Sequence, residues 1–309
     1  MIKQKKLNSE AAASSLVGDA RGRSLWQDTV RRFKKNKLAL ICVGFLLLLS
    51  VISISTLVLD LVTNNAFYDQ NVISQNLRSR LAPPSSEHIF GLDEFGRNIF
   101  LRVLWGTRYS LFMGMLSVTF AVILGGILGS ISGFYGGRVD HAIMRVMDVL
   151  MAMPAILLAI AIVAALGSGL ANVLIAIAVS FVPNFARVVR AAVMTVRDQE
   201  FVEAASAVGA SDLRIITEHI LPNALAPIIV QATLSVASAI LFLASLSFLG
   251  LGIQPPAPEW GAMLSSARIY LRDSWHIAVF PGLAIVLTIL ALNIVGDGLR
   301  DALDPKLKN

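Results

Sequence analysis

Residues 203–222, EAASAVGASDLRIITEHILP, form a polar stretch between two long apolar segments of the chain. The stretch carries Glu203 and Glu218, and the apolar runs on either side of it are long enough to cross a bilayer. No nucleotide-binding motif occurs elsewhere in the chain. A membrane protein that keeps a charged, helical loop in water is therefore expected to present that loop to a soluble partner.

Six apolar runs predict an all-α membrane protein with six transmembrane helices. Hydrophobic residues make up 56% of the 309 positions and charged residues 15%, a balance too apolar for a soluble domain. The runs approach or reach the roughly 18 to 25 residues that cross about 30 Å of hydrocarbon. They are Leu38–Val62, Leu111–Ile131, Val149–Leu166, a run from Leu170 into Val182 and beyond, Ala224–Phe248 and Ala278–Val295. An even number of spans places both termini on one side.

Basic residues predict that this side is the cytoplasm. With the N-terminus inside, 19 of the 26 Lys and Arg residues fall in cytoplasmic segments and 7 fall outside. Every Lys falls inside, including those in the basic run Arg31–Lys37. The net charge of +6 is thus mainly a topological signal, and we expect contact with membrane lipid and no nucleic-acid binding.

The chain divides into four expected parts. Residues 1–37 form a cytoplasmic tail, loosely ordered over 1–24 and ending in an amphipathic helix from Ser24 on the membrane surface. Residues 38–62 are the first span. Residues 63–109 form an extracytoplasmic loop and an interfacial helix, with Trp105 and Tyr109 at headgroup level. Residues 110–309 form a five-helix core that contains the loop 198–222, and residues 250–277 form a rigid, irregular outer loop.

The loop itself is expected to hold two short helices. Asp198 can cap a helix that begins near Gln199, on which Phe201, Ala204 or Ala205, and Val208 form an apolar stripe. Gly209 ends this helix, because glycine adopts the left-handed conformation without a steric penalty. Ser211 and Asp212 then begin a second helix that runs through His219, and Pro222 opens the next span.

Glycines at four-residue spacing mark the second span. Gly125, Gly129, Gly133 and Gly137 share one helical face, and small residues of this kind let helix backbones approach closely in lipid. A phosphate-binding loop would need a preceding strand and a following Lys-Ser/Thr, and the sequence has neither. The fourth span is expected to be broken at Pro183-Asn184 and to project towards the cytosol.

The polar stretch resembles the EAA loop of permease subunits in bacterial ABC importers. That loop reads Glu-Ala-Ala, three residues, Gly, nine residues, Ile-x-Leu-Pro, and His219 stands here at the Ile position. This departure agrees with the His-Ile-Leu/Val-Pro-Asn variant of the peptide and nickel permeases. Further segments resemble the same permeases, especially the second, or C-type, permease of oligopeptide importers: 23–28, 91–97, 247–252, 259–261 and 296–305.

The resemblance implies a type I importer permease in the bacterial inner membrane. It implies pairing with a second, different permease, two ABC ATPase subunits and an extracytoplasmic substrate-binding protein. ATP and Mg would be used by the ATPase subunits, and this chain would bind no cofactor or metal and have no catalytic residue. The coupling residues implied are Glu203, Ala204, Ala205, Gly209, His219, Leu221 and Pro222. The substrate would be an oligopeptide or dipeptide, or alternatively a nickel chelate, glutathione or a related solute.

Two other classes of protein, a secondary transporter and an intramembrane enzyme, are alternatives to a permease subunit. A proton-coupled secondary transporter usually places ionisable residues at membrane depth, whereas Asp60 and Asp148 lie at the ends of predicted spans. An intramembrane enzyme would need a catalytic or metal-binding constellation. The four histidines lie on separate segments, and no His-Glu-x-x-His motif occurs. The sequence therefore favours a transport subunit driven by a separate motor.

Overall fold

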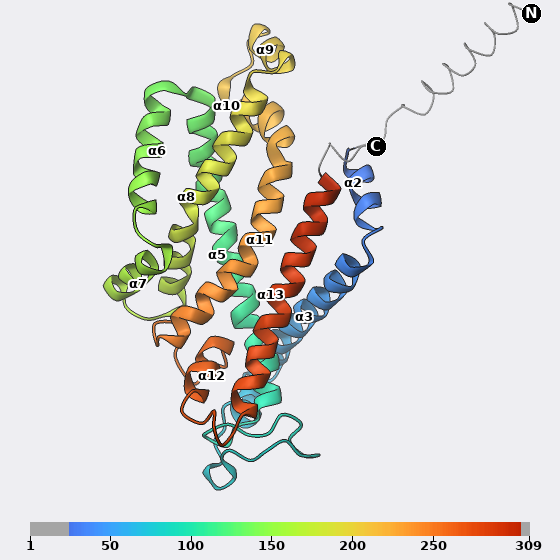
Figure 1. Ribbon diagram of the computed structural model, residues 1–309, viewed down its shortest axis with the longest axis vertical. Coiled ribbons are helices and arrows are strands. Elements are labelled where there is room, and N and C mark those ends of the chain that lie inside the picture. Colours follow the sequence, from blue (N-terminus) through green and yellow to red (C-terminus); the bar gives the residue numbers. More distant parts are fainter. Residues whose placement is uncertain (1–24, 304–309) are drawn as a thin grey trace, which may run out of the picture.

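The computed structural model describes residues 25–303, and these residues form a bundle of long helices (Figure 1). Five helices are long and apolar enough to cross a membrane. They are α3 (Lys37–Val62), α5 (Ile99–Tyr135), α8 (Leu170–Arg197), α11 (Leu221–Phe248) and α13 (His276–Leu303). No strand occurs among the described residues, where one isolated bridge joins Leu92 and Asn98. The expected all-α membrane fold is confirmed.

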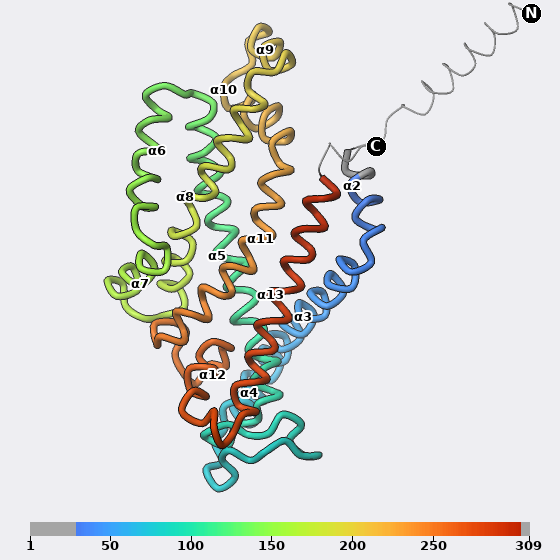
Figure 2. Tube along the Cα trace, in the orientation of Figure 1, coloured from blue at the N-terminus to red at the C-terminus, as the bar shows by residue number. Residues whose placement is uncertain are grey.

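Shorter elements lie at the two ends and along one side of the bundle. These are α2 (Leu25–Phe33), α4 (Ala66–Asn71), the 3₁₀ turn η1 (Leu77–Ser79), α6 (Gly137–Met151), α7 (Ala155–Leu166), α9 (Glu200–Ala207), α10 (Asp212–Arg214), the π-helical turn η2 (Ile215–Ile220) and α12 (Trp260–Ala267). Helix α2, the end of α13 and α9 lie at one end of the bundle, and α4 and α12 lie at the other (Figure 2). The predicted amphipathic helix is α2, and the tail 1–24 lies outside the described residues.

The prediction that Val149–Leu166 forms one straight span is wrong. Helix α6 ends at Met151, α7 begins at Ala155, and the two helices are bent by 86°. The reason lies at Met153-Pro154, because a residue before proline is driven away from the α conformation. The described helices thus number five spans, or six where this bent pair forms one broken span, and α7 lies across the bundle while α6 runs along it (Figure 1).

The structure also differs from the expected separate interfacial helix before the second span. Helix α5 runs without interruption from Ile99 to Tyr135, so the interfacial and spanning segments are one helix. Trp105 is buried within the bundle, with only 4% of its surface exposed. Its indole Nε1 donates to the Asp60 carboxylate at 3.1 Å, and Arg108 forms an ion pair with the same carboxylate. The outer ends of α3 and α5 are thereby tied together.

The fourth span is not broken at Pro183, because α8 continues through the proline as one helix to Arg197. The outer loop 250–277 is more regular than expected, since it contains α12. Glu259 caps α12 by accepting from the amides of Gly261 at 2.9 Å and Ala262 at 2.8 Å. Burial raises the pKa of the Glu259 carboxyl, and those amide hydrogen bonds act in the opposite direction.

The turn at residues 91–98 is built around one carboxylate. Asp93 accepts from the backbone amides of Phe95 and Arg97, each at 2.9 Å, and from Arg97 Nε at 2.7 Å. Arg102 Nη1 donates to the carbonyls of Val72 at 3.3 Å and Pro256 at 3.2 Å, so it joins two loops that are distant in sequence. The end of the bundle opposite α9 is therefore held by a network of polar contacts.

Candidate functional site

Helix α9 projects from one end of the bundle and is the centre of the candidate site (Figure 1). Its inner face carries Val202 and Ala205, which are 5% and 8% exposed. These two side chains belong to one apolar cluster with Val189 and Val193 of α8. The same cluster includes Ile215 and Ile220 of η2, and α9 packs mainly against η2. The helix is therefore fixed to the turn that follows it and, through this cluster, to the end of α8.

The outer face of α9 is both apolar and acidic. Phe201 is 43% exposed and Val208 85% exposed, and Ala204 is exposed between them. Glu200 and Glu203 are exposed on the same short helix. The apolar stripe expected from the sequence thus faces away from this chain. Exposed apolar side chains beside carboxylates suit a partner groove that has an apolar floor and basic rims.

Two of the expected helix caps differ from the prediction. The Asp198 side chain pairs with Arg197 at 2.9 Å, and Gln199 occupies the N-cap position of α9 without a side-chain hydrogen bond. Ser211 is the N-cap of α10 but also makes no side-chain cap. Gly209 has φ +83°, so the expected left-handed residue follows α9 where the chain turns back.

The second helix of the loop does not end at His219. Helix α10 passes into the π-helical turn η2, which passes directly into α11, so the chain is helical from Asp212 to Phe248. His219, Leu221 and Pro222 therefore lie within one continuous helical segment. We call residues 198–214, which hold α9 and α10, the coupling arm. Leu221 and Pro222 form the first turn of α11. The structure thus brings together the short exposed helix α9 and the long helical segment from Asp212 to Phe248.

The base of this arm holds polar contacts that the sequence analysis missed. Asp140 on α6 accepts from Arg190 Nε and Nη2, each at 2.5 Å, and from Ser132 Oγ at 2.5 Å. Arg197 Nη1 donates to the Gly133 carbonyl at 3.0 Å. The sequence shows a regular series of arginines on α8, but Asp140 and the Gly133 carbonyl, which Arg190 and Arg197 contact, lie 50 and 64 positions away from them.

A second contact ties the arm to α5. The Tyr135 hydroxyl, at the last residue of α5, donates to Asp212 Oδ2 at 3.0 Å. Asp212 begins α10, so this hydrogen bond joins the end of a spanning helix to the coupling arm. We call the ends of α5, α6 and α8, together with α9, the coupling block.

The glycines of α5 lie against α8 at close range. A Cβ placed on Gly125, Gly129 or Gly133 would lie 2.6, 2.5 or 2.9 Å from atoms of α8. Gly137 meets no atom within 4 Å, and it lies in α6 rather than in α5. The close approach continues towards the outer end, where Gly114 meets Ile240 of α11 and Gly106 meets Trp260. The glycine spacing over 125–133 predicted only part of this contact.

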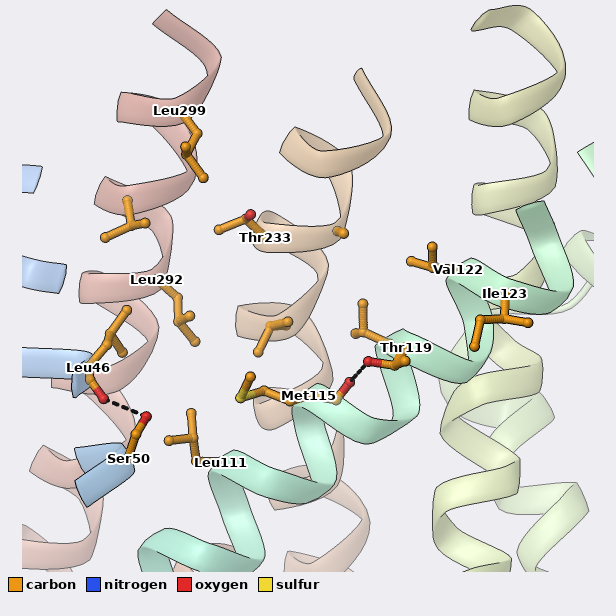
Figure 3. A pocket seen from close by; sticks show the side chains of 14 residues that line it. Leu46, Ser50, Leu111, Met115, Thr119, Val122, Ile123, Thr233, Leu292 and Leu299 are labelled. Atoms are coloured by element: carbon orange, nitrogen blue, oxygen red, sulfur yellow. Dashed lines mark hydrogen bonds between the residues drawn. The ribbon is translucent and has the colours of Figure 1, made fainter. Parts of the chain in front are cut away.

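Cavities between the described helices are mainly apolar. One of about 470 Å³ lies among α3, α5, α11 and α13 (Figure 3). Its hydroxyl groups are used within their own helices: Ser50 donates to the Leu46 carbonyl, Thr119 to Met115 and Thr233 to Ile229. Two further cavities, of about 420 and 710 Å³, have similarly apolar linings. None of the three offers a set of free polar groups for a polar solute.

The geometry describes a spanning bundle with a small helix held at one end, and comparison with known proteins identifies it. Residues 121–309 match the family model of the inner membrane component of binding-protein-dependent transport systems. The chain belongs to this family. Residues 24–84 of the permease also match a model described as the N-terminal transmembrane domain of oligopeptide transport permease C.

Curated relatives cover nearly the whole permease. It is 50% identical to a dipeptide transport system permease protein, DppC, of Alkalihalophilus pseudofirmus, over 93% of this chain and 91% of the relative. It is 44% identical to a glutathione transport system permease protein, GsiD, of Pectobacterium atrosepticum, over 96% and 97%. The corresponding protein of Escherichia coli O157:H7 is 46% identical, over 96% and 95%.

Solved structures with the same fold are ABC transporter chains. A chain of the inward-facing MetNI methionine ABC transporter aligns with TM-score 0.55 at 19% identity, over 67% of the permease and 98% of that chain. A chain of an amino acid ABC transporter crystallised with histidines aligns with TM-score 0.51 at 14% identity, over 65% and 94%. The expected importer-permease fold is confirmed, and the permease is a multi-pass inner-membrane protein.

Proposed function

We propose that this permease is the membrane subunit of an ATP-driven peptide importer and that α9 receives mechanical work from a separate ATPase. The observation that carries the proposal is the outer face of α9. Phe201 and Val208 are exposed there beside Glu203, on a helix whose inner face is packed in an apolar cluster with η2 and α8. A helix that is rigidly attached but offers apolar side chains to water can transmit force from a docked partner.

The hydrolysis of ATP belongs to partner subunits in this proposal. The chain has no Gly-x-x-x-x-Gly-Lys-Ser/Thr sequence, so we assign it no catalytic residue and no bound ATP or Mg. Two ABC ATPases would close on ATP and push α9, and the coupling block would pass that movement to α5 and α8. Rigid-body rocking of packed helices is an established route between two openings.

A second, different permease would complete the pathway. The three cavities of the single chain are lined mainly by apolar groups, whereas a peptide carries several backbone amides and two charged ends. Polar contacts for such a cargo must then come from a surface that the single chain does not close by itself. A heterodimer of permeases, served by an external binding protein, supplies it.

Both described ends of the permease lie at the α9 end of the bundle (Figure 1). If α9 meets a cytosolic ATPase, Leu25 and Leu303 also lie near the cytosolic surface. The excess of basic residues in the segments at that end supports this orientation. We therefore propose that both termini are cytoplasmic.

Dipeptides or oligopeptides are the proposed cargo, and glutathione is the second candidate. The first is supported by 50% identity to a dipeptide permease and the second by 44–46% identity to glutathione permeases. Glutathione is itself a modified tripeptide, so one pathway can suit both. We expect the external binding protein to decide between them.

The test uses the complete importer reconstituted in vesicles with its binding protein. ATP hydrolysis is measured with no solute, with a dipeptide and with glutathione. We expect the dipeptide to stimulate hydrolysis several-fold more than glutathione does. Stimulation by glutathione alone would assign the second cargo, and stimulation by neither solute would contradict peptide import.

A further inference from the structure

The turn that joins the coupling arm to α11 has an unusual hydrogen-bond step. The Ile215 amide donates to the Ser211 carbonyl at 2.9 Å, the four-residue step of an α-helix. At the end of η2, the Leu221 amide donates to the Ile216 carbonyl, a five-residue step. Such π-helical turns are rare, occur mostly as single insertions in α-helices and are frequent at functional sites. We call η2 (Ile215–Ile220) the wide turn.

Pro222 explains why the wide turn stops where it does. Proline has no amide hydrogen, so the Glu218 carbonyl cannot receive the α-helical bond from position 222. The next residue supplies a side-chain donor, because Asn223 Nδ2 donates to the His219 carbonyl at 2.7 Å. Pro222 therefore leaves the Glu218 carbonyl without a backbone donor, and Asn223 gives the next carbonyl, that of His219, a side-chain donor.

The two sides of the wide turn differ in how firmly they are held. On one side lies the coupling block, with the Asp140–Arg190 ion pair and the Tyr135–Asp212 hydrogen bond. On another side lies the cavity of about 420 Å³, lined by Ile216 and Thr217 of the wide turn and by Gly126 and Ile127 of α5. Ile215 and Ile220 of the wide turn are buried in the apolar cluster with α9 and α8, so that face moves with the coupling block. The face towards the cavity has room to change its shape.

We propose that the wide turn is the joint at which the coupling arm moves relative to α11, with Pro222 and Asn223 holding its register. This inference rests on the proposed function, because the movement is driven by the ATPase docked on α9. In this proposal the joint moves when backbone amides of the wide turn change from carbonyls five residues earlier to carbonyls four residues earlier. Each residue of an α-helix advances about 1.5 Å and turns about 100°, so a small change of step reorients the arm strongly.

The experiment measures movement across the joint in the assembled importer. Spin labels are placed at Ser211→Cys, on the arm, and Leu241→Cys, on α11, in a Cys42→Ser background. Ser211 makes no side-chain cap and Leu241 is 54% exposed, so both positions tolerate a label. Distances are recorded without nucleotide and with ATP and vanadate. We expect a nucleotide-dependent shift in the otherwise unaltered chain.

Pro222→Ala restores an amide and permits an uninterrupted α-helix. We expect this change to reduce the nucleotide-dependent shift at least twofold and ATP-driven uptake at least fivefold, while the ATPase subunits still co-purify. Pro227→Ala is the matched control, because Pro227 also lies inside α11 but beyond the wide turn. It should leave the shift unchanged. An unreduced nucleotide-dependent distance shift in Pro222→Ala would contradict the proposal that the wide turn is the joint.

A second measurement tests the proposal if the Pro222→Ala variant does not assemble with the ATPase subunits. Asn223→Ala removes only the side-chain donor to His219, and hydrogen exchange of the amides at 217–221 should then accelerate at least tenfold. Unchanged exchange rejects the assigned role of Asn223. If the unaltered chain fails to bind ATPase subunits at all, the proposed function fails and the joint fails with it.

Discussion

Replacing Glu203 with Lys and Gly209 with Ala in one variant is expected to leave the permease inserted in the membrane but to abolish ATP-driven uptake. Glu203 is exposed on the outer face of α9, so reversing its charge disturbs the partner contact and not the core. Gly209 has φ +83°, where a Cβ costs about 1–2 kcal/mol, so Ala tilts or frays α9. We expect co-purification with the ATPase subunits to be lost and uptake to fall at least tenfold.

A matched double variant at the other end of the bundle provides the control. Gly250 has φ +80° and, like Gly209, has no atom within 4 Å of an added Cβ. Glu87 is exposed on the loop between α3 and α5. Glu87→Lys with Gly250→Ala repeats the same chemistry far from α9 and should leave ATPase binding intact. Normal ATPase binding and uptake in the Glu203 and Gly209 variant would favour a secondary transporter instead.

Gly129→Ala is expected to destabilise the whole bundle. An added Cβ would lie 2.5 Å from the Ala186 carbonyl oxygen and 2.9 Å from Val189 Cβ, so α5 and α8 must separate. Overpacking a close contact costs about 1–3 kcal/mol, and the clash here is with backbone. We expect a lower melting temperature of the purified protein in detergent and less folded protein in the membrane.

Gly126→Ala isolates this packing effect from helix propensity. Gly126 lies in the same helix three positions earlier, and its added Cβ meets nothing within 4 Å. Both substitutions gain about 1 kcal/mol of intrinsic helix propensity. Gly126→Ala should therefore be neutral or stabilising. Equal melting temperatures for the two variants would refute close packing of α5 on α8 at Gly129.

Local sequence signals predicted the spanning helices well. Long apolar runs placed α3 and α13, and glycine spacing placed the α5 face that meets α8. These features depend on residues that are near one another in sequence. The same reasoning found Gly209, because a left-handed residue after a short helix is a local requirement.

Long-range contacts and backbone register could not be predicted in the same way. The sequence suggests a headgroup position for Trp105 because tryptophan is common there, but it does not reveal the Asp60 carboxylate, 45 positions away, that accepts from its indole. The third span was drawn through Pro154, although the residue before a proline resists the α conformation. The wide turn depends on which carbonyl each amide selects, and a hydrophobic pattern carries little information about that choice.

Accessibility of Ala207 tests the central claim, that the arm between α8 and α11 faces the cytosol to meet an ATPase. Ala207 is exposed at the end of α9, and a cysteine there is labelled with a membrane-impermeant maleimide in the Cys42→Ser chain. A cysteine at Glu87, on the loop between α3 and α5, is the control. We expect labelling at 207 only in inside-out vesicles and labelling at 87 only in intact spheroplasts. Labelling of position 207 from outside intact spheroplasts would contradict it.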